Sequence, residues 1–458
     1  MSDGSADILA ITGGSAGLEA MYAAVRALAE TFDRAGDRLR EVALEGARLA
    51  GDADLLESSL LSPATAVRAE TDLLAATTGP HGLLVESVAW EAAARGTRAC
   101  VEALEAADRT QRAAFEVIDY SLARQLGTMA GSPLVISGLP LAIGLGGEDL
   151  LTDHPGAVEH LVNGGGGLID GLSGRLLGPL HPTITPTTED AAAQLGALYP
   201  EGHASVVGLP VTVPAAQPAS VEDLLAHLGE VAALSPGSES PLNGTIEIQT
   251  VTTAGGEVVH IVNLPGTDDL GTLPWTADGD VRDMGTNLDL IAGVPDDYQQ
   301  GILQAMHDAG IAPDDPVLLV GHSQGGMEAA AIAASGHGFR VTDVVTAGSP
   351  TAQVRHGFPE GTNVLSIEQR GDLVPLLDGE KNPDTVHQTT VVVDAHPGHG
   401  ITTHHGYPAY ISGAAAIDRS GHPSILDAVQ SMQSHGYLGT GGHVASQVFQ
   451  ITRVPNST

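Results

Sequence analysis

The sequence contains very little cysteine, lysine or aromatic side chain. Cys100 is the single cysteine, so no intramolecular disulfide can form and cysteine usage leaves the cellular compartment open. Aromatic residues make up 3% of the 458 residues, so the cores must be built from Ala, Leu, Val and Ile. The hydrophobic fraction of 42% is sufficient for such cores, and the length predicts two or three domains.

Positive charge is also scarce. Nineteen Lys and Arg stand against 56 Asp and Glu, which gives a formal net charge of −37 at pH 7. A field of this sign repels nucleic acids and anionic membranes, so neither is expected as a partner.

Long apolar runs are missing as well. The longest, residues 134–145, is interrupted by Pro140 and is too short to span a bilayer, so no transmembrane segment is expected. The opening Met1-Ser2-Asp3-Gly4 lacks the basic start of a signal peptide. We therefore expect a cytoplasmic protein, or one exported without a cleavable signal.

Residues 1–130 are predicted to form an all-α hairpin or bundle domain. Apolar residues recur at steps of three and four from Leu18 to Val42 and again from Val101 to Leu122. The break at residues 79–82, Gly-Pro-His-Gly, separates the two series. Two long helices joined by turns would bury these stripes against each other.

The segment around Trp90 resembles the W-x-G region of the small helical-hairpin WXG family, whose members are type VII secretion substrates. Ala92 replaces the glycine of that motif, and Tyr120 is followed four residues later by Arg124 instead of an acidic residue. The resemblance implies a helical partner or a secretion machinery that acts through residues 15–130. Trp90 as an ordinary core or interface aromatic residue is the alternative interpretation.

The rest of the chain divides into two predicted parts. Residues 131–243 read as a connecting region with short helices at 189–198 and 221–234. Residues 244–458 alternate strands with helices, which predicts an α/β domain with a mostly parallel sheet. In such sheets ligands bind at the carboxyl ends of the strands.

The sequence Gly321-His322-Ser323-Gln324-Gly325 lies between a predicted strand and a predicted helix. The apolar segment 316–320 before it reads as a buried strand, and the alanine-rich segment after it reads as a helix. A strand, a sharp G-x-S-x-G turn and a helix form a nucleophile elbow, which exposes the serine hydroxyl above the sheet. The pattern alone is weak in a chain with 58 glycines, and Ser15 lies in a second copy near the N-terminus. We interpret Ser15 as a helix-start residue.

A nucleophilic serine needs a histidine to take its proton and a carboxylate to orient that histidine. The chain offers both after Ser323, each following a predicted strand. Asp372 follows the strand at 363–369, and His405 follows the strand at 387–394. Other candidates for the acid are Asp394 and Asp378, and other candidates for the base are His404, His399 and His396.

These motifs resemble the α/β-hydrolase superfamily and, more narrowly, its class 3 (fungal-type) lipase family. The resemblance rests on three further segments: Asp372-Leu373-Val374-Pro375, Gly348-Ser349-Pro350, and Leu264-Pro265-Gly266-Thr267 with Trp275 beyond. It implies a catalytic triad of Ser323, Asp372 and His405. It also implies an oxyanion hole made by the backbone N–H groups of Gln324 and Thr267. No hydrophobic lid segment is visible within 244–458, which departs from interfacial lipases.

No cofactor and no metal are expected. The group His396, His399, His404 and His405 suggests zinc, but it lacks a cysteine partner and the helical H-E-x-x-H spacing. His322 beside the nucleophile is expected to have a structural role. The sequence therefore predicts a serine hydrolase that cleaves carboxylic esters, with a small-molecule or lipid ester as its substrate. The alternative is an interaction or effector protein whose helical domain is the functional part.

Overall fold

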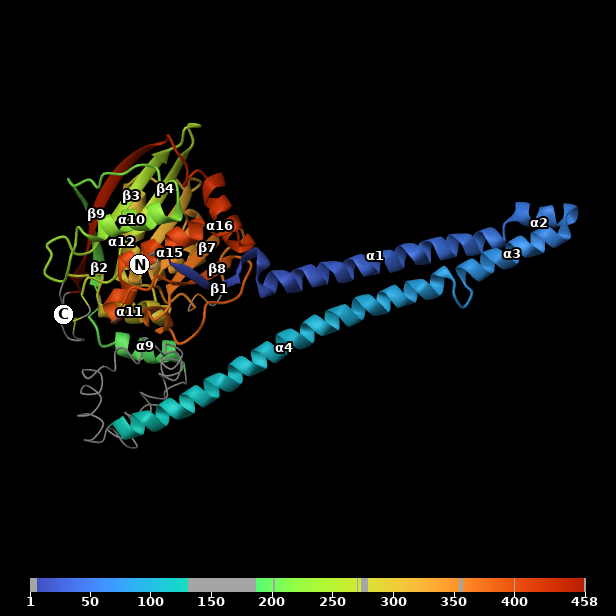
Figure 1. Cartoon of the computed structure of the whole chain (residues 1–458), viewed down its shortest axis with the longest axis horizontal. Coiled ribbons are helices and arrows are strands. Elements are labelled where there is room, and N and C mark those ends of the chain that lie inside the picture. Colours follow the sequence, from blue (N-terminus) through green and yellow to red (C-terminus); the bar gives the residue numbers. More distant parts are fainter. Residues whose placement is uncertain are drawn as a thin grey trace. The chain divides into compact units, whose positions relative to one another are not determined.

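The computed structural model of the chain describes residues 6–130, 187–200, 202–269, 271–272, 279–352, 354, 357–398 and 400–456. Within these residues the chain divides into two compact units, residues 19–114 and residues 1–18 together with 115–458. The first unit is helical and the second contains the sheet (Figure 1).

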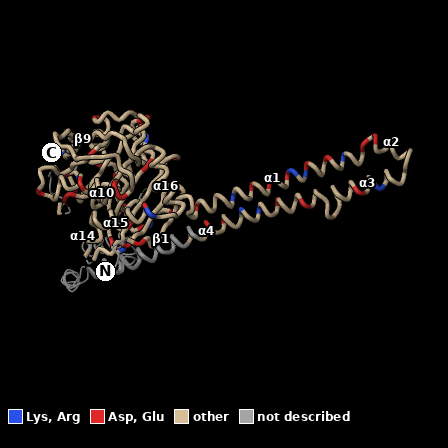
Figure 2. Tube along the Cα trace, turned by 45° about the horizontal axis from the view of Figure 1, so that its top comes forward, with Lys and Arg blue, Asp and Glu red and all other residues tan. Residues whose placement is uncertain are grey.

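The helical unit is a hairpin. Its helices are α1 (Leu18–Ala50), α2 (Ala53–Leu61), α3 (Pro63–Thr77) and α4 (Leu83–Ala130). The chain turns back through α2, so that α3 and then α4 run back along α1, and the predicted Gly-Pro break at residues 79–82 separates α3 from α4 without reversing the chain (Figure 1). Ion pairs join the two long helices, for example Arg26 to Glu105 at 2.5 Å and Arg98 to Asp33. Figure 2 shows the basic and acidic positions interspersed along both helices.

The seam of the hairpin differs from the predicted apolar stripes. Small residues at steps of seven are buried there: Ala29, Gly36 and Ala43 on α1, with Ser87, Ala94 and Val101 on α4. Several of the larger apolar residues of the predicted stripe are exposed instead, including Leu18, Met21, Val25, Leu28 and Val42. Small side chains at the seam let the helix backbones approach closely, which turns the larger residues outwards.

The second unit is built around a sheet that has nine strands within the described residues. The strands are β1 (Asp7–Gly13), β2 (Gly202–Leu209), β3 (Thr245–Thr252), β4 (Val258–Leu264), β5 (Pro316–His322), β6 (Arg340–Ala347), β7 (Asn363–Gln369), β8 (Gln388–Asp394) and β9 (His443–Pro455). Their order in the sheet is β1-β8-β7-β6-β5-β4-β3-β9-β2. Strands β4 to β8 are parallel, and the flanking strands pair antiparallel.

Helices cover both faces of this sheet (Figure 1). One core lies between the sheet and α10 (Val221–Ala232), α15 (Tyr407–Asp418) and α16 (Pro423–Ser434). The other lies between the sheet and α12 (Asp297–Asp308) and α13 (Gln324–Ser335). The sequence of the central strand β5 is continuously apolar because both of its faces are buried. Leu318 and Val320 enter the first core, whereas Val317 and Leu319 enter the second.

The predicted fold class is confirmed: a mostly parallel sheet with helices on both faces, in a chain that also carries an all-α hairpin. The boundaries differ from the expected 1–130, 131–243 and 244–458. Strand β1 precedes the hairpin and pairs with β8, and β2 and α10 belong to the sheet unit although they lie in the expected connecting region. The remaining short helices are α9 (Thr188–Gly196), α11 (Met284–Ile291) and α14 (Ile401–His405).

Candidate active site

Ser323 occupies a strained turn between β5 and α13. Its φ of 53° and ψ of −125° lie outside the favoured regions for an L-residue, and His396 is the other non-glycine residue with positive φ among those described. The neighbouring glycines make this turn possible. A Cβ on Gly321 would lie 2.2 Å from the Gly325 carbonyl oxygen, and one on Gly325 would lie 2.0 Å from that of Leu264. The strand, the turn and the helix therefore pack as the G-x-S-x-G spacing predicts.

Asp372 and His405 meet at the carboxyl end of the sheet. Nδ1 of His405 donates to Oδ2 of Asp372 at 2.7 Å, and the Asp372 side chain is fully buried. Asp372 follows β7, and its Oδ1 accepts the backbone N–H of Val374 at 2.9 Å. The hydroxyl of Tyr410 donates to the same Oδ2. The carboxylate is thus held from three directions, and the His405 ring is fixed with its Nε2 free of Asp372.

His322 supports the loop that carries His405. Its Nε2 donates to the His405 carbonyl oxygen at 2.8 Å, and its ring packs on those of His405 and Tyr407 with centroids 4.6 and 4.3 Å apart. Burial and the nearby His405 lower the pKa of His322 to about 3. His322 is therefore neutral at ordinary pH and holds the backbone of His405, which agrees with the structural role expected for it.

The segment Gly348-Ser349-Pro350 packs against both the turn and the histidine. Gly348 has φ of +66°, and a Cβ there would lie 2.8 Å from the Tyr410 hydroxyl and 3.1 Å from Cε1 of His405. A Cβ on Gly326 would lie 2.0 Å from Oγ of Ser349. Both glycines are needed because side chains from β6, α13 and α15 converge here.

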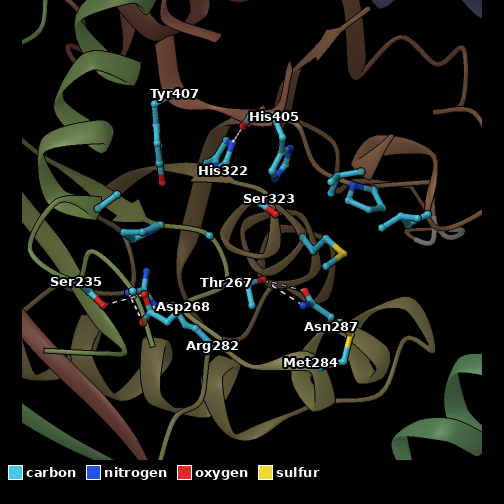
Figure 3. Close-up of a pocket in the computed structure, with 18 of the residues that line it drawn as sticks. Ser235, Thr267, Asp268, Arg282, Met284, Asn287, His322, Ser323, His405 and Tyr407 are labelled. Atoms are coloured by element: carbon cyan, nitrogen blue, oxygen red, sulfur yellow. Dashed lines mark hydrogen bonds and ion pairs between the residues drawn. The ribbon is translucent and has the colours of Figure 1, made fainter. Parts of the chain in front are cut away.

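Ser323 and His405 line one cavity of about 590 Å³, in the size range of small-molecule sites. Figure 3 shows His405 and His322 beside Ser323, with Thr267 on the opposite side of the serine. The side chains of Ser323 and His405 both belong to the described residues, and no direct hydrogen bond joins them. Hydrogen bonds of this kind often form only when a substrate binds. Apolar walls come mainly from α10, α11 and the turns after β6 and β7, through Ala232, Ala233, Met284, Leu288, Ile291, Met327, Pro350, Val374 and Leu377.

Thr267 and Gln324 flank the serine. Oγ1 of Thr267 accepts a hydrogen bond from Nδ2 of Asn287 at 3.1 Å, and Gln324 Nε2 donates to the Asp283 carbonyl oxygen at 2.9 Å. Gly266 lies so close that a Cβ there would be 2.9 Å from Cβ of Ser323. The loop after β4 and the first residue of α13 thus both adjoin Ser323. Trp275, which we expected beyond this loop, lies outside the described residues.

The other candidates lie elsewhere. Both ring nitrogens of His404 face carbonyl oxygens, Nδ1 that of Arg370 at 2.8 Å and Nε2 that of Gly398 at 3.1 Å. His396 is exposed and pairs with Asp394 at 3.2 Å. Asp378 accepts the Ala352 backbone N–H at 2.9 Å, and burial raises its pKa well above the usual value. His399 lies outside the described residues.

The described residues contain no cluster of three or more His, Cys, Asp or Glu side chains with the geometry of a metal site. None of the described helices is long and apolar enough to span a bilayer.

The sequence analysis missed several polar residues of this site. Tyr410 was not predicted as a site residue, yet its hydroxyl donates to the Asp372 carboxylate. Tyr407, Asn287 and the ion pair of Arg282 with Asp268 also line the cavity and were not predicted. A helical step of three links Tyr407 to Tyr410 and could have indicated their shared face. Isolated polar residues in loops give no such periodic signal.

Comparison with known families agrees with this geometry. Residues 299–364 match a family model described as alpha/beta hydrolase. The matched segment runs from α12 through β5, Ser323 and α13 to the start of β7. It supports the α/β-hydrolase superfamily for the sheet unit, whereas the class 3 lipase and WXG resemblances remain predictions. No curated protein and no solved structure matches the chain significantly.

Proposed function

We propose that the protein is a serine hydrolase that cleaves carboxylic esters through an acyl-enzyme. The observation that carries the proposal is the 2.7 Å hydrogen bond between buried Asp372 and Nδ1 of His405, in a histidine that lines the same cavity as the strained Ser323. A carboxylate in this position keeps the proton on Nδ1, so Nε2 is the basic nitrogen that can take the serine proton.

In the proposed reaction Ser323 Oγ attacks the ester carbonyl carbon while His405 Nε2 takes its proton. The resulting tetrahedral oxyanion would be stabilised by the backbone N–H groups of Gln324 and Thr267. The Thr267 hydroxyl accepts from Nδ2 of Asn287 at 3.1 Å and has only a long contact of 3.5 Å to Oδ1 of Asn287 as donor, so it would turn its proton to the oxyanion as a third donor. Protonated His405 then gives its proton to the departing alcohol oxygen as the C–O bond breaks. Water, activated by His405, releases the acid and restores Ser323.

A fluorophosphonate probe tests the nucleophile. We expect labelling of the wild type and none of Ser323→Ala, and failure to label the wild type would overturn the proposal. Hydrolysis of p-nitrophenyl esters of rising chain length then separates an esterase, which favours short acyl chains, from a lipase. Thioesters and amides belong in the same series, because specificity depends on pocket shape.

A paired substitution tests the base. His405→Gln should lower kcat about 10³-fold or more, since the general base is lost. His404→Gln should stay within about tenfold, because its ring contacts backbone carbonyls away from the cavity. A larger loss for His404→Gln than for His405→Gln would transfer the role to His404.

A second candidate function concerns the hairpin, and the apolar residues exposed on it favour this function. Leu60 and Leu61 at the end of α2 are 86% and 91% exposed, and Trp90 on α4 is 39% exposed beside Phe32. Apolar surface of this kind suits a helical partner or a secretion machinery. Recovery of the native protein only from cell lysate, never from culture supernatant or envelope, would argue against export.

A further inference from the structure

The wall of the Ser323 cavity contains a buried arginine with unused hydrogen-bond donors. Arg282 is 1% exposed. Its Nε donates to Oδ2 of Asp268 at 2.8 Å, and its Nη2 forms an ion pair with the same oxygen at 2.5 Å. Its Nη1 is buried and has no hydrogen-bond partner within the described part of the chain. A buried donor without a partner is costly, so it indicates a missing acceptor.

Tyr407 contributes a second unpartnered group to the same cavity. Its hydroxyl oxygen is buried near the backbone N–H of Gly266, but the hydroxyl proton has no acceptor in hydrogen-bonding geometry among the described residues. Burial raises the pKa of Tyr407 to about 12, so the hydroxyl keeps its proton and can donate. In Figure 3 this hydroxyl points into the cavity, toward the part of the wall that contains Ser235, Asp268 and Arg282.

Both groups share one requirement. A guanidinium can only donate hydrogen bonds, and the protonated tyrosine hydroxyl donates one. An oxygen acceptor carried by the substrate satisfies both. In Figure 3 Met284 and Asn287 lie at the other side of the cavity from Ser235 and Asp268, so this polar wall forms one side of the cavity that Ser323 lines.

We propose that Arg282 and Tyr407 form a subsite that binds a neutral oxygen acceptor, such as a ketone, ether or hydroxyl oxygen, in the acyl or alcohol part of an ester substrate. This rests on the proposed function of Ser323. The subsite makes the enzyme selective for oxygen-bearing esters over plain alkyl esters of the same length.

The charges of Arg282 and Asp268 favour a neutral acceptor over an anion. The Asp268 carboxylate already neutralises Arg282, and it is itself fixed by Oγ of Ser235 and the backbone N–H of Gly244, both at 2.8 Å. An additional carboxylate or phosphate would be a buried charge without a counterion, which is strongly unfavourable. The net charge of −37 adds to this penalty.

The test compares p-nitrophenyl esters of a straight-chain fatty acid with those of keto acids of equal length, with the ketone moved along the chain. Acetates of the matching alcohols and keto alcohols test the leaving-group side. We expect the kcat/KM of the wild type for one keto ester to exceed that for the plain ester of equal length by about tenfold or more. This ratio corresponds to the penalty for leaving a buried hydrogen-bond donor unsatisfied. Tyr407→Phe and the double variant Arg282→Met with Asp268→Asn should bring this ratio toward one.

The two variants protect the test against misfolding. The double variant removes both charges of the pair together, and Tyr407→Phe removes only a hydroxyl whose proton has no acceptor among the described residues. Tyr437→Phe removes a buried hydroxyl that bonds Thr342 outside the cavity, so it should keep the ratio of the wild type. Equal rates for keto and plain esters, or a preference for an ester ending in a carboxylate, would overturn the subsite. Hydrolysis of neither ester would instead overturn the proposed function and remove the basis of the subsite.

Discussion

The hydroxyl of Tyr410 donates to Oδ2 of Asp372, the same oxygen that accepts the hydrogen bond from His405. Tyr410 and Asp372 are both buried, so the tyrosine holds the carboxylate without exposing it to water. The pKa of Tyr410 is raised well above the usual value by burial and by the Asp372 charge, so it remains a donor. We infer that Tyr410 is a positioning residue that acts through Asp372.

Tyr410→Phe tests this positioning role. Loss of a hydrogen bond to a charged group should lower the free energy of unfolding by about 1.5–3 kcal/mol. It should also lower kcat about tenfold, because the carboxylate that orients His405 is less well fixed. Urea unfolding and steady-state kinetics measure the two effects. Tyr437→Phe is the matched control, since that hydroxyl bonds Thr342 Oγ1 at 2.6 Å, is buried and lies outside the cavity. Equal kcat losses in both variants would contradict the role.

Asp372→Asn should lower kcat about 10⁴-fold with little change in KM. The amide can donate to Nδ1 of His405 and so stabilise the tautomer that carries its proton on Nε2, where no serine proton can be accepted. Asp378→Asn is the comparison, because Asp378 accepts the backbone N–H groups of Ala352 and Glu380 and bonds no histidine among the described residues. A greater kcat loss in Asp378→Asn would identify Asp378 as the acid.

Whether the sequence predicted a part of this site depends on how far apart in the chain the interacting residues lie. The turn at Ser323 was predictable because its strand, glycines and helix are contiguous. The order of Ser323, Asp372 and His405 was predictable because each residue follows a strand of the parallel sheet. The pairing of Asp372 with His405, rather than with His404, depends on how the short helix α14 turns its two histidines, and no sequence pattern determines that.

The parts of the fold that were missed are the edge strands and the hairpin seam. Strand β1 pairs with β8 across more than 370 residues of chain, and its residues alternate too weakly in hydrophobicity to be read as a strand. Strand β9 pairs with both β2 and β3, so its role depends on two distant partners. In the hairpin, the larger apolar residues gave the periodic signal, whereas alanine and glycine at steps of seven form the seam.

Gly266→Ala should damage the proposed oxyanion hole. The new Cβ would lie 2.9 Å from Cβ of Ser323 and 3.1 Å from Nδ1 of His322, so the loop carrying Thr267 must shift. A displacement of about 1 Å at a reacting centre costs roughly 100-fold in rate, and we expect kcat to fall by 10- to 100-fold. Gly421→Ala is the control, because no atom lies within 4 Å of the Cβ it would add. Unchanged kcat in Gly266→Ala would show that the loop does not constrain the reacting geometry.

Glu328 on α13 and Asp296 before α12 form a buried acid pair behind the serine. No described group donates in good geometry to Oδ2 of Asp296 or to either carboxyl oxygen of Glu328, although the Gln299 side chain lies near Glu328; a proton between the two carboxyls would join them. Burial raises the pKa of Asp296 to about 7, and burial together with the Asp296 charge raises that of Glu328 well above its usual value. The folded protein therefore retains protons that the unfolded chain loses near pH 4.

This pair should make the protein less stable as the pH rises. Below about pH 4 both states hold the protons, and the full stability is present. Between about pH 4 and about pH 7 the unfolded state binds fewer protons, so the free energy of unfolding falls by about 1.4 kcal/mol per pH unit for each retained proton.

Glu328→Gln removes one acid and keeps an amide that can donate to Asp296. We expect this variant to unfold at a higher temperature than the wild type at about pH 8 and at a similar temperature at about pH 4. Thermal unfolding followed by circular dichroism measures this, with exposed Glu257→Gln as the control for loss of a surface carboxylate. If Glu328→Gln and the wild type lose stability in parallel as the pH rises, the pair is not protonated in the folded protein.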